Sequence, residues 1–325
     1  MALLEIKGLK THFKTDDGWL HAVDGVDIAI DRGETVGVVG ESGCGKSVMA
    51  KTVMKLIDMP PGRIVAGQVL WRGRDLVPLP PEAMQKIRAK EISIIFQEPM
   101  TSLNPVYSIG EQIAESLRLH EGLSRKDAMD RAVELLKLVR IPTPERRVGD
   151  YPHHFSGGMR QRVMIAIALA CKPQLLIADE PTTALDVTIQ AQILDLLAEL
   201  KGSMGMAVML ITHAMGVVAE VAQRVVVMYA GQVVEEAPVE ELFAHPRHPY
   251  TQGLIRSIPR IDTAAIHKVR LEAIPGVVPQ LIEPGEGCRF AARCKHARPA
   301  CLQATPPLRD VAPRHKVACI LDVAA

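Results

Sequence analysis

The chain has 325 residues, enough for about two domains, and 48% apolar with 23% charged residues is the balance of a folded protein. Its 38 Lys and Arg nearly cancel its 37 Asp and Glu, which argues against a broad basic face, so no nucleic-acid partner is expected. The longest apolar run, 163–171, is far shorter than the roughly 20 residues of a membrane-spanning helix, and the N-terminus resembles no signal peptide. We therefore expect a chain that stays in the cytoplasm and does not itself cross a membrane.

Apolar strand-like segments alternate with helical patterns. Alternating or continuous aliphatic residues predict strands at 3–9, 22–30, 35–39, 92–96, 175–178, 206–211 and 225–228. A period near 3.6 predicts helices at about 46–57, 109–119, 125–139, 158–171 and 187–201. This alternation predicts an α/β core with a largely parallel sheet.

Two segments interrupt the alternation. Residues 98–155 are helix-rich, which predicts an inserted helical subdomain. After residue 258 the periodicity fades, and seven prolines lie between Pro275 and Pro313 near four of the six cysteines. We expect a main domain over 1–258 and a small C-terminal module over 259–325.

A phosphate-binding loop follows the strand at 35–39. The segment Gly40-Glu41-Ser42-Gly43-Cys44-Gly45-Lys46-Ser47 matches G-x-x-x-x-G-K-[ST] and opens a helix, a context that favours a nucleotide site over a plain glycine-rich turn. Its backbone N–H groups can surround phosphate, Lys46 can reach the β- and γ-phosphates, and Ser47 can bind Mg²⁺. Cys44 fills a variable position, where its thiol could make the loop sensitive to thiol reagents.

Two acids end the strand at 175–178. Asp179 and Glu180 follow it directly, and the carboxyl end of a parallel strand lies beside the phosphate loop. Asp179 can then bind Mg²⁺ through water, and Glu180 can polarise an attacking water. The alternative is a pair of solvated loop acids.

A second candidate anion site begins the helix at 158–171. Ser156-Gly157-Gly158 is a glycine-rich helix start, whose N–H groups favour an anion. One nucleotide does not need two such sites, so this one is expected to serve a nucleotide held by a partner subunit. The alternative is an ordinary capped helix with a tight turn.

Taken in order, these motifs resemble those of ATP-binding-cassette (ABC) ATPases. Gln97 resembles the Q-loop glutamine, Ser156-Gly157-Gly158 the signature motif, Pro181-Thr182-Thr183-Ala184-Leu185-Asp186 the D-loop, and His213 the switch histidine. The segments 96–105, 177–188 and 248–251 resemble ATP-binding subunits of dipeptide, oligopeptide and nickel importers, nearest the D-type subunit of dipeptide permeases.

The resemblance implies an α/β P-loop NTPase fold. It comprises an ABC-ATPase core with an antiparallel β subdomain, a helical subdomain at about 98–155, and a small C-terminal Cys-rich module typical of oligopeptide/dipeptide transporters. It also implies an ATPase that powers uptake of dipeptides or oligopeptides, peripheral to the cytoplasmic side of the inner membrane. The implied partners are a second ABC ATPase subunit in a heterodimer, two transmembrane permease subunits and, through them, a periplasmic or extracellular solute-binding protein. Nickel or another small solute remains an alternative cargo. A soluble non-transport ABC protein fits less well, because the chain has one cassette and neither a heptad arm nor a basic stripe.

The resemblance assigns roles to individual residues. Glu180 is the expected catalytic base, His213 contacts the γ-phosphate, and Gln97 contacts Mg²⁺ and the attacking water. ATP is expected to contact Phe13 (stacking on adenine), Gly40, Ser42, Gly43, Cys44, Gly45, Lys46, Ser47 and Val48, with Ser156, Gly157, Gly158 and Asp186 acting across the dimer seam. The expected Mg²⁺ ligands are Ser47, Gln97 and Asp179.

Two positions depart from the family pattern. Met159 stands where the general signature has Gln, and it cannot donate a side-chain hydrogen bond. Ala214 follows His213 where the family usually has Asp. This change weakens the expected support of the switch histidine and allows the two composite ATP sites to be unequal.

Four cysteines lie in the C-terminal segment. Cys288, Cys294, Cys301 and Cys319 have the spacing C-x5-C-x6-C-x17-C, which lacks the tight pairs of most zinc sites. Their spacing leaves zinc, an iron–sulfur cluster and unligated thiols open. The resemblance to dipeptide-importer subunits favours a [4Fe-4S] cluster.

Overall fold

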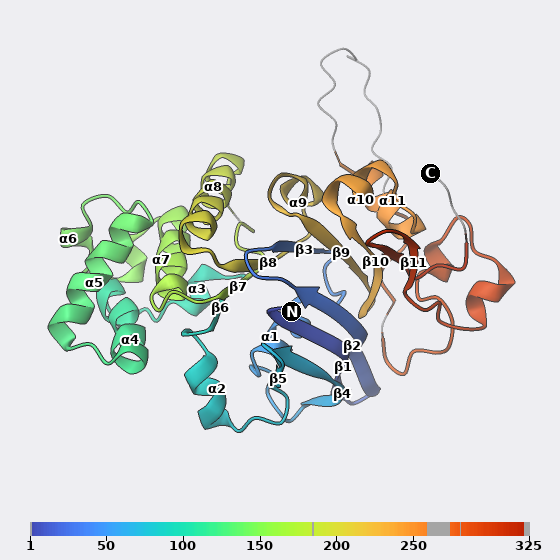
Figure 1. Ribbon diagram of the computed structural model, residues 1–325, viewed down its shortest axis with the longest axis horizontal. Coiled ribbons are helices and arrows are strands. Elements are labelled where there is room, and N and C mark those ends of the chain that lie inside the picture. Colours follow the sequence, from blue (N-terminus) through green and yellow to red (C-terminus); the bar gives the residue numbers. More distant parts are fainter. Residues whose placement is uncertain (1, 184, 259–273, 280, 322–325) are drawn as a thin grey trace, which may run out of the picture. The chain divides into compact units, whose positions relative to one another are not determined.

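The computed structural model describes residues 2–183, 185–258, 274–279 and 281–321, which form two compact units (Figure 1). Unit 1 is built from Met1–Ile30, Thr35–Val77 and Thr212–Ala325, and unit 2 from Asp31–Glu34 and Pro78–Ile211. Ala184 of the expected D-loop and residues 259–273, where the expected C-terminal module begins, lie outside the described residues.

Unit 1 holds an antiparallel sheet near the N-terminus. Its order is β2-β1-β4-β5, with β1 (Leu4–Thr15), β2 (Gly18–Ile30), β4 (Gly62–Trp71) and β5 (Arg74–Asp75). Pairing on both edges carries β1 beyond the segment 3–9 that the sequence predicts, as far as the turn at Asp16 and Asp17. The sequence analysis did not predict β4.

The second sheet of unit 1 leads into the phosphate loop. Within this unit its order is β11-β12-β10-β9-β3, with β3 (Thr35–Val39), β9 (Arg224–Tyr229), β10 (Gln232–Pro238), β11 (Arg309–Ala312) and β12 (His315–Val317). Strands β3 and β9 are parallel and buried at every position, which explains their continuous aliphatic sequences. The other elements are α1 (Lys46–Val53), α9 (Met215–Val221), α10 (Val239–Ala244), α11 (Pro249–Arg256), η2 (Ala291–Arg293) and η3 (Pro299–Leu302).

A buried acid attaches the C-terminal strands to this sheet. Strand β12 pairs with β10, and the side chains of His315 and Glu235 are both fully buried. The ring Nε2 of His315 lies 2.8 Å from Glu235, whose carboxylate also accepts the backbone N–H groups of Arg247 and His248 at 2.7 and 2.9 Å. A buried carboxylate is tolerated only when it is partnered in this way.

Unit 2 combines a parallel sheet with a group of helices. Its strands run in the order β8-β7-β6, with β6 (Ile92–Ile95), β7 (Leu175–Asp179) and β8 (Ala207–Thr212). Its helices are α2 (Pro81–Ile87), α3 (Pro99–Ser102), α4 (Ile109–Glu121), α5 (Arg125–Leu138), α6 (Pro144–Arg147), η1 (Pro152–His154), α7 (Gly157–Leu169) and α8 (Val187–Met204). Helices α4 to α7 pack together (Figure 1, green).

Local capping fixes where the helices of unit 2 begin. The side chains of Ser108 and Ser124 accept backbone N–H groups at the starts of α4 and α5. Each helix then turns an apolar face inward, with Ile113 and Leu117 buried on α4 and Leu135 and Leu136 on α5. No helix among the described residues is long and apolar enough to span a membrane.

The His315–Glu235 pair predicts a pH-dependent stability. Its hydrogen bond to Glu235, together with nearby Glu241, raises the pKa of His315 above its usual 6.5 against the opposing effect of burial. The stability from the protonated ring is therefore complete below pH 6.5 and is lost as the pH rises through the higher folded-state pKa. We expect the difference in thermal midpoint between wild type and His315→Gln to be larger at about pH 6 than at about pH 9.

The exposed His296 provides the control, because His296→Gln should leave the midpoint nearly unchanged at both pH values. An equal loss for His315→Gln at the two pH values would contradict a role for the ring's charge.

Candidate active site

The phosphate loop of unit 1 joins β3 to α1 and cages its own lysine. Lys46 is 4% exposed, and its ammonium donates to the carbonyl oxygens of Gly40 and Glu41 at 2.7 and 3.0 Å. The ammonium thus sits within the loop, where a bound triphosphate can compete for its donors. Ser47 and Val48 follow on the first turn of α1 and are partly buried.

Close backbone packing explains the last glycine of the loop. Gly45 has a φ of 99° and is the N-cap residue of α1. A Cβ at this position would lie 2.2 Å from the carbonyl oxygen of Ala22 on β2. Only glycine permits both this approach and this backbone angle.

Residues far away in sequence support the loop. The backbone N–H of Glu41 donates to the hydroxyl of Tyr250 on α11 at 2.8 Å, and the N–H of Gly231 donates to the carbonyl of Cys44 at 2.9 Å. Cys44 is itself fully buried, and burial raises the pKa of its thiol. A buried neutral thiol is a poor nucleophile, so the geometry disfavours the thiol sensitivity considered above. The sequence analysis noted the segment containing Tyr250 but assigned it no role.

In unit 2 the side chains of Gln97 and Thr183 lie within hydrogen-bonding distance of the Glu180 side chain. Glu180 follows β7 and is 8% exposed, and its carboxylate accepts from Gln97 Nε2 at 3.2 Å and from Thr183 Oγ1 at 2.8 Å. Asp179, at the end of β7, is 2% exposed. Thr183 was expected from the sequence to lie in the D-loop, but its contact with Glu180 was not predicted.

The backbone of Glu180 adopts an unusual conformation. Its φ of 48° is left-handed, which non-glycine residues rarely adopt, and its N–H is held by the carbonyl of Ile211 at 2.9 Å. Such strain persists only where surrounding contacts fix it, and it clusters at functional sites. Here it turns the carboxylate toward Gln97 and Thr183.

The predicted anion-binding corner is an exposed helix start. Ser156 caps α7 by accepting the N–H of Met159 at 3.4 Å, and both Ser156 and Gly157 are exposed. Gly158 packs closely, because a Cβ there would lie 2.7 Å from Ile189 of α8. Asp186 caps α8 by accepting the N–H of Ile189 at 2.9 Å and is exposed. Helix α7 thus has the ordinary serine cap of the alternative interpretation. Its N-terminal end is also exposed, so its backbone N–H groups are accessible to an anion.

His213 precedes α9 in unit 1 and is exposed. Ala214 is the N-cap residue of α9, and no side chain caps this helix. An aspartate there could accept a backbone N–H, a contact typically worth about 1 kcal/mol. The departure from the family pattern therefore removes a helix cap directly after the predicted switch histidine.

The remaining predicted nucleotide contact lies on β1. Phe13 is partly buried, pairs across the strands with Leu20 and Gly62, and packs against Gly62. The predicted ATP-site residues thus divide between the units. Phe13, the phosphate loop and His213 belong to unit 1, and Gln97, Asp179, Glu180, Ser156, Gly157, Gly158 and Asp186 belong to unit 2.

The four C-terminal cysteines line one cavity of unit 1. Cys288, Cys294, Cys301 and Cys319 border a small cavity together with Phe290 and apolar neighbours. Burial, followed by neighbouring thiols, raises the pKa of Cys288 and Cys294.

The spacing of the sulfur atoms tests which group fits. One zinc ion holds thiolates at about 2.3 Å and draws their sulfurs within about 4 Å of one another. Among the described residues, only His12, His21 and Asp24 bring three such ligand atoms within 4.8 Å. No three of these four described cysteine sulfurs therefore lie within 4.8 Å of one another, so their arrangement does not match that of a single tightly bound zinc ion.

Comparisons with known proteins agree with this architecture. The family model for "ABC transporter" matches residues 23–183, and that for "Oligopeptide/dipeptide transporter, C-terminal region" matches residues 234–301. The oligopeptide transport ATP-binding protein OppD of Bacillus subtilis is 54% identical over 97% of this chain and 87% of its own length. The dipeptide transport ATP-binding protein DppD of Haemophilus influenzae is 50% identical over 98% and 95%.

Among solved structures, the ATP-binding cassette MJ0796, a dimer in a post-hydrolysis state bound to ADP and Pi, aligns with a TM-score of 0.65. It is 30% identical over 73% of this chain and 98% of its own. The chain therefore belongs to the ATP-binding proteins of ABC transporters, in the branch that carries the oligopeptide/dipeptide transporter C-terminal region. The predicted P-loop ABC ATPase fold is confirmed.

The packing of Gly45 predicts the effect of one added methyl group. Gly45→Ala would force a Cβ against the Ala22 carbonyl at a left-handed backbone angle, so the loop must move. We expect the affinity for a fluorescent ATP analogue to fall at least about tenfold. Gly202→Ala in α8, where no atom lies within 4 Å of the added Cβ, should bind like wild type. Wild-type affinity in a folded Gly45→Ala variant would contradict this role.

Proposed function

We propose that this chain is the ATP-hydrolysing subunit of an importer for dipeptides or oligopeptides. The observation that carries the proposal is the strained, buried Glu180, held by Gln97 and Thr183 at the end of β7, in a chain that also carries a caged phosphate-loop lysine. The relatives' roles in oligopeptide and dipeptide transport support a peptide cargo.

The chain's own residues divide the work of hydrolysis. The Lys46 ammonium exchanges its bonds to loop carbonyls for the β- and γ-phosphates, while the loop N–H groups cradle the phosphate oxygens. Glu180 accepts a proton from the attacking water, which Gln97 helps to orient, and His213 donates to the γ-phosphate. Ser47, Asp179 and Gln97 offer the hard oxygen ligands that suit Mg²⁺; when bound there, the ion would neutralise charge on the transferred phosphoryl group.

We place the Ser156-Gly157-Gly158 corner and Asp186 at the nucleotide of a second ATPase subunit. The exposed N-terminal end of α7 and the dimeric arrangement of the related MJ0796 cassette support this role. In this proposal the partner forms a heterodimer with the chain on the cytoplasmic side of the membrane. The helical subdomain, about 98–155 within the nucleotide-binding domain 1–258, docks on two permease subunits served by a solute-binding protein. Phe13 stacks on the adenine.

We also propose that residues 259–325 form a Cys-rich module whose four cysteines bind a [4Fe-4S] cluster. The cavity that all four cysteines line supports ligation of one group by these residues. Such a cluster would fasten a proline-rich segment and would stabilise the deprotonated thiolates.

Replacing Glu180 tests the proposed ATPase mechanism. Glu180→Gln retains the shape and the contact with Thr183 but cannot accept the proton, so we expect ATP hydrolysis to fall at least about a hundredfold. Binding of a fluorescent ATP analogue should stay close to the wild-type affinity. Glu220→Gln, at an exposed position on α9, should leave both properties unchanged. Hydrolysis near the wild-type rate in Glu180→Gln would remove this residue from the role of base.

Anaerobic purification tests the proposed cluster. The protein should absorb light at about 400 nm and contain about four iron atoms per chain. Cys294→Ser should lose most of the iron, whereas Cys171→Ser, outside the cavity, should retain it. Stoichiometric zinc, or a metal-free chain with four free thiols, would refute the cluster.

A further inference from the structure

An arginine of the C-terminal segment binds the phosphate loop directly. Arg293 lies in η2 between two of the cavity cysteines, and its two terminal nitrogens reach the two carboxylate oxygens of Glu41 at 2.6 and 2.9 Å. Glu41 is the second residue of the loop. This parallel two-point contact is the strongest arrangement available to arginine and a carboxylate.

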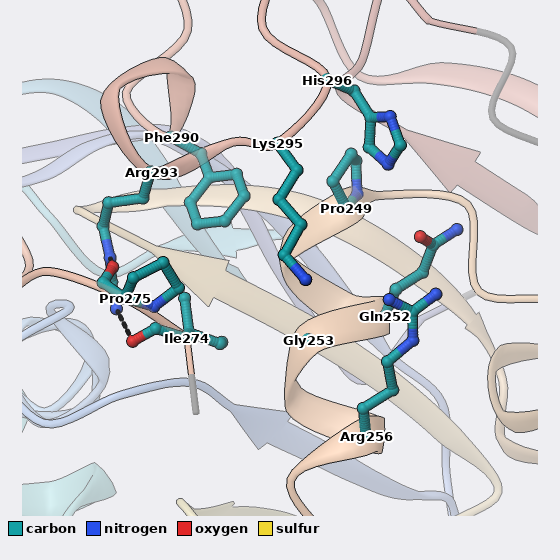
Figure 2. Close-up of a pocket in the computed structure, with 10 residues that line it drawn as sticks. All are labelled: Pro249, Gln252, Gly253, Arg256, Ile274, Pro275, Phe290, Arg293, Lys295 and His296. Atoms are coloured by element: carbon teal, nitrogen blue, oxygen red, sulfur yellow. Dashed lines mark hydrogen bonds between the residues drawn. The ribbon is translucent and has the colours of Figure 1, made fainter. Parts of the chain in front are cut away.

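The guanidinium is fixed on its other sides as well. Its Nε donates to the carbonyl of Pro275 at 2.8 Å, and its Cζ lies 5.7 and 6.0 Å from the ring centres of Tyr229 and Phe290. Figure 2 shows Arg293 beside Phe290 and Pro275, with a further bond to the carbonyl of Ile274. The Arg293 side chain is 5% exposed. A buried arginine with its donors occupied is a rigid anchor, not a mobile surface charge.

Every polar group of Glu41 is consequently engaged. Its N–H donates to the Tyr250 hydroxyl at 2.8 Å, its carbonyl accepts from the Lys46 ammonium at 3.0 Å, and its carboxylate binds Arg293. Two of these three contacts come from Tyr250 and Arg293, which lie outside the loop and far from it in sequence. The Lys46 ammonium must release the loop carbonyls before it can bind phosphate. The loop therefore needs contacts other than those of Lys46 to keep its shape when ATP is bound.

A second arginine of the same segment supports the rear of the loop. Arg289 binds the carboxylate of Asp24 and the carbonyl of Ala230. The Asp24 N–H donates to the carbonyl of Gly231, and the Gly231 N–H donates to the carbonyl of Cys44. The C-terminal segment thus reaches the loop along two independent routes.

The negative charge of Glu41 connects the Arg293 contact to the binding of ATP, which is also negatively charged. Glu41 places a carboxylate within a loop that must accept a triphosphate, and like charges at close range repel. We propose that Arg293 is a positioning residue of the ATP site, which neutralises the Glu41 carboxylate and holds it away from the phosphates. The inference rests on the ATPase function proposed above. It gives the cysteine-bearing segment a direct part in nucleotide binding.

Arg293→Gln tests the proposal. The variant keeps much of the side-chain stem and one donor but loses the charge and the fork. We expect the Kd for a fluorescent ATP analogue to rise about tenfold, with kcat at saturating ATP within about twofold of wild type. Adding Glu41→Gln should restore most of the affinity, because the carboxylate that Arg293 neutralises is then gone. Arg314→Ala, an exposed arginine in the same segment, should bind ATP like wild type.

Circular dichroism and thermal midpoints establish which variants fold. If Arg293→Gln does not fold, Arg293→Lys replaces it: the charge remains without the fork, so KM should rise while kcat is retained. Unchanged affinity in a folded Arg293 variant, or a loss that Glu41→Gln does not relieve, would overturn the proposal. ATP binding by the wild type and ATP hydrolysis by Glu180→Gln are measured separately. These two results test the proposed ATPase function itself, so its failure can be told apart from failure of the proposal for Arg293.

Discussion

The conformation of the phosphate loop depends on more than the bonds that Lys46 makes within it. Neighbours in unit 1 also hold it: the Ala22 carbonyl lies against Gly45, the Tyr250 hydroxyl accepts the Glu41 N–H, and the Gly231 N–H donates to Cys44. Unpaired buried backbone groups are costly, so these contacts stabilise the folded loop. The position of the Lys46 ammonium follows from them.

Unit 2 uses a different device to position its acid. The parallel strands β7 and β8 bring the Ile211 carbonyl to the N–H of Glu180, which holds this residue at a left-handed φ. The side chains of Gln97 and Thr183 donate hydrogen bonds to its carboxylate. In the mechanism proposed above, a backbone held in this conformation would keep the Glu180 carboxylate pre-organised and reduce the reorganisation that proton transfer requires.

The C-terminal segment is rich in proline, and ion pairs attach it to the rest of unit 1 in addition to apolar packing. The His315–Glu235 pair attaches β12 to β10, and the Arg293–Glu41 pair attaches η2 to the phosphate loop. Cys294 and Cys301 lie between these two attachments in sequence. Any group bound in the cavity is therefore joined to the nucleotide site through a short, rigid stretch of chain.

Local patterns were sufficient for much of the fold and for the positions of the phosphate-loop motif and of the acids that follow β7. The loop motif, the buried runs of β3 and β7, and the serine caps of α4 and α5 each lie within a few residues of what they specify. Strands β4, β10 and β12 were not predicted, because their sequences become strands only through partners elsewhere in the chain.

What the amino-acid sequence determined by itself was therefore the chemistry: which residues can bind phosphate, accept a proton and cap a helix. Only the tertiary structure decided which distant groups hold them in place. Tyr250 and Arg293 meet Glu41 across 209 and 252 residues, and the left-handed backbone of Glu180 depends on a neighbouring strand. No local pattern encodes such pairs, because their partners come together only when the sheets form and bury them.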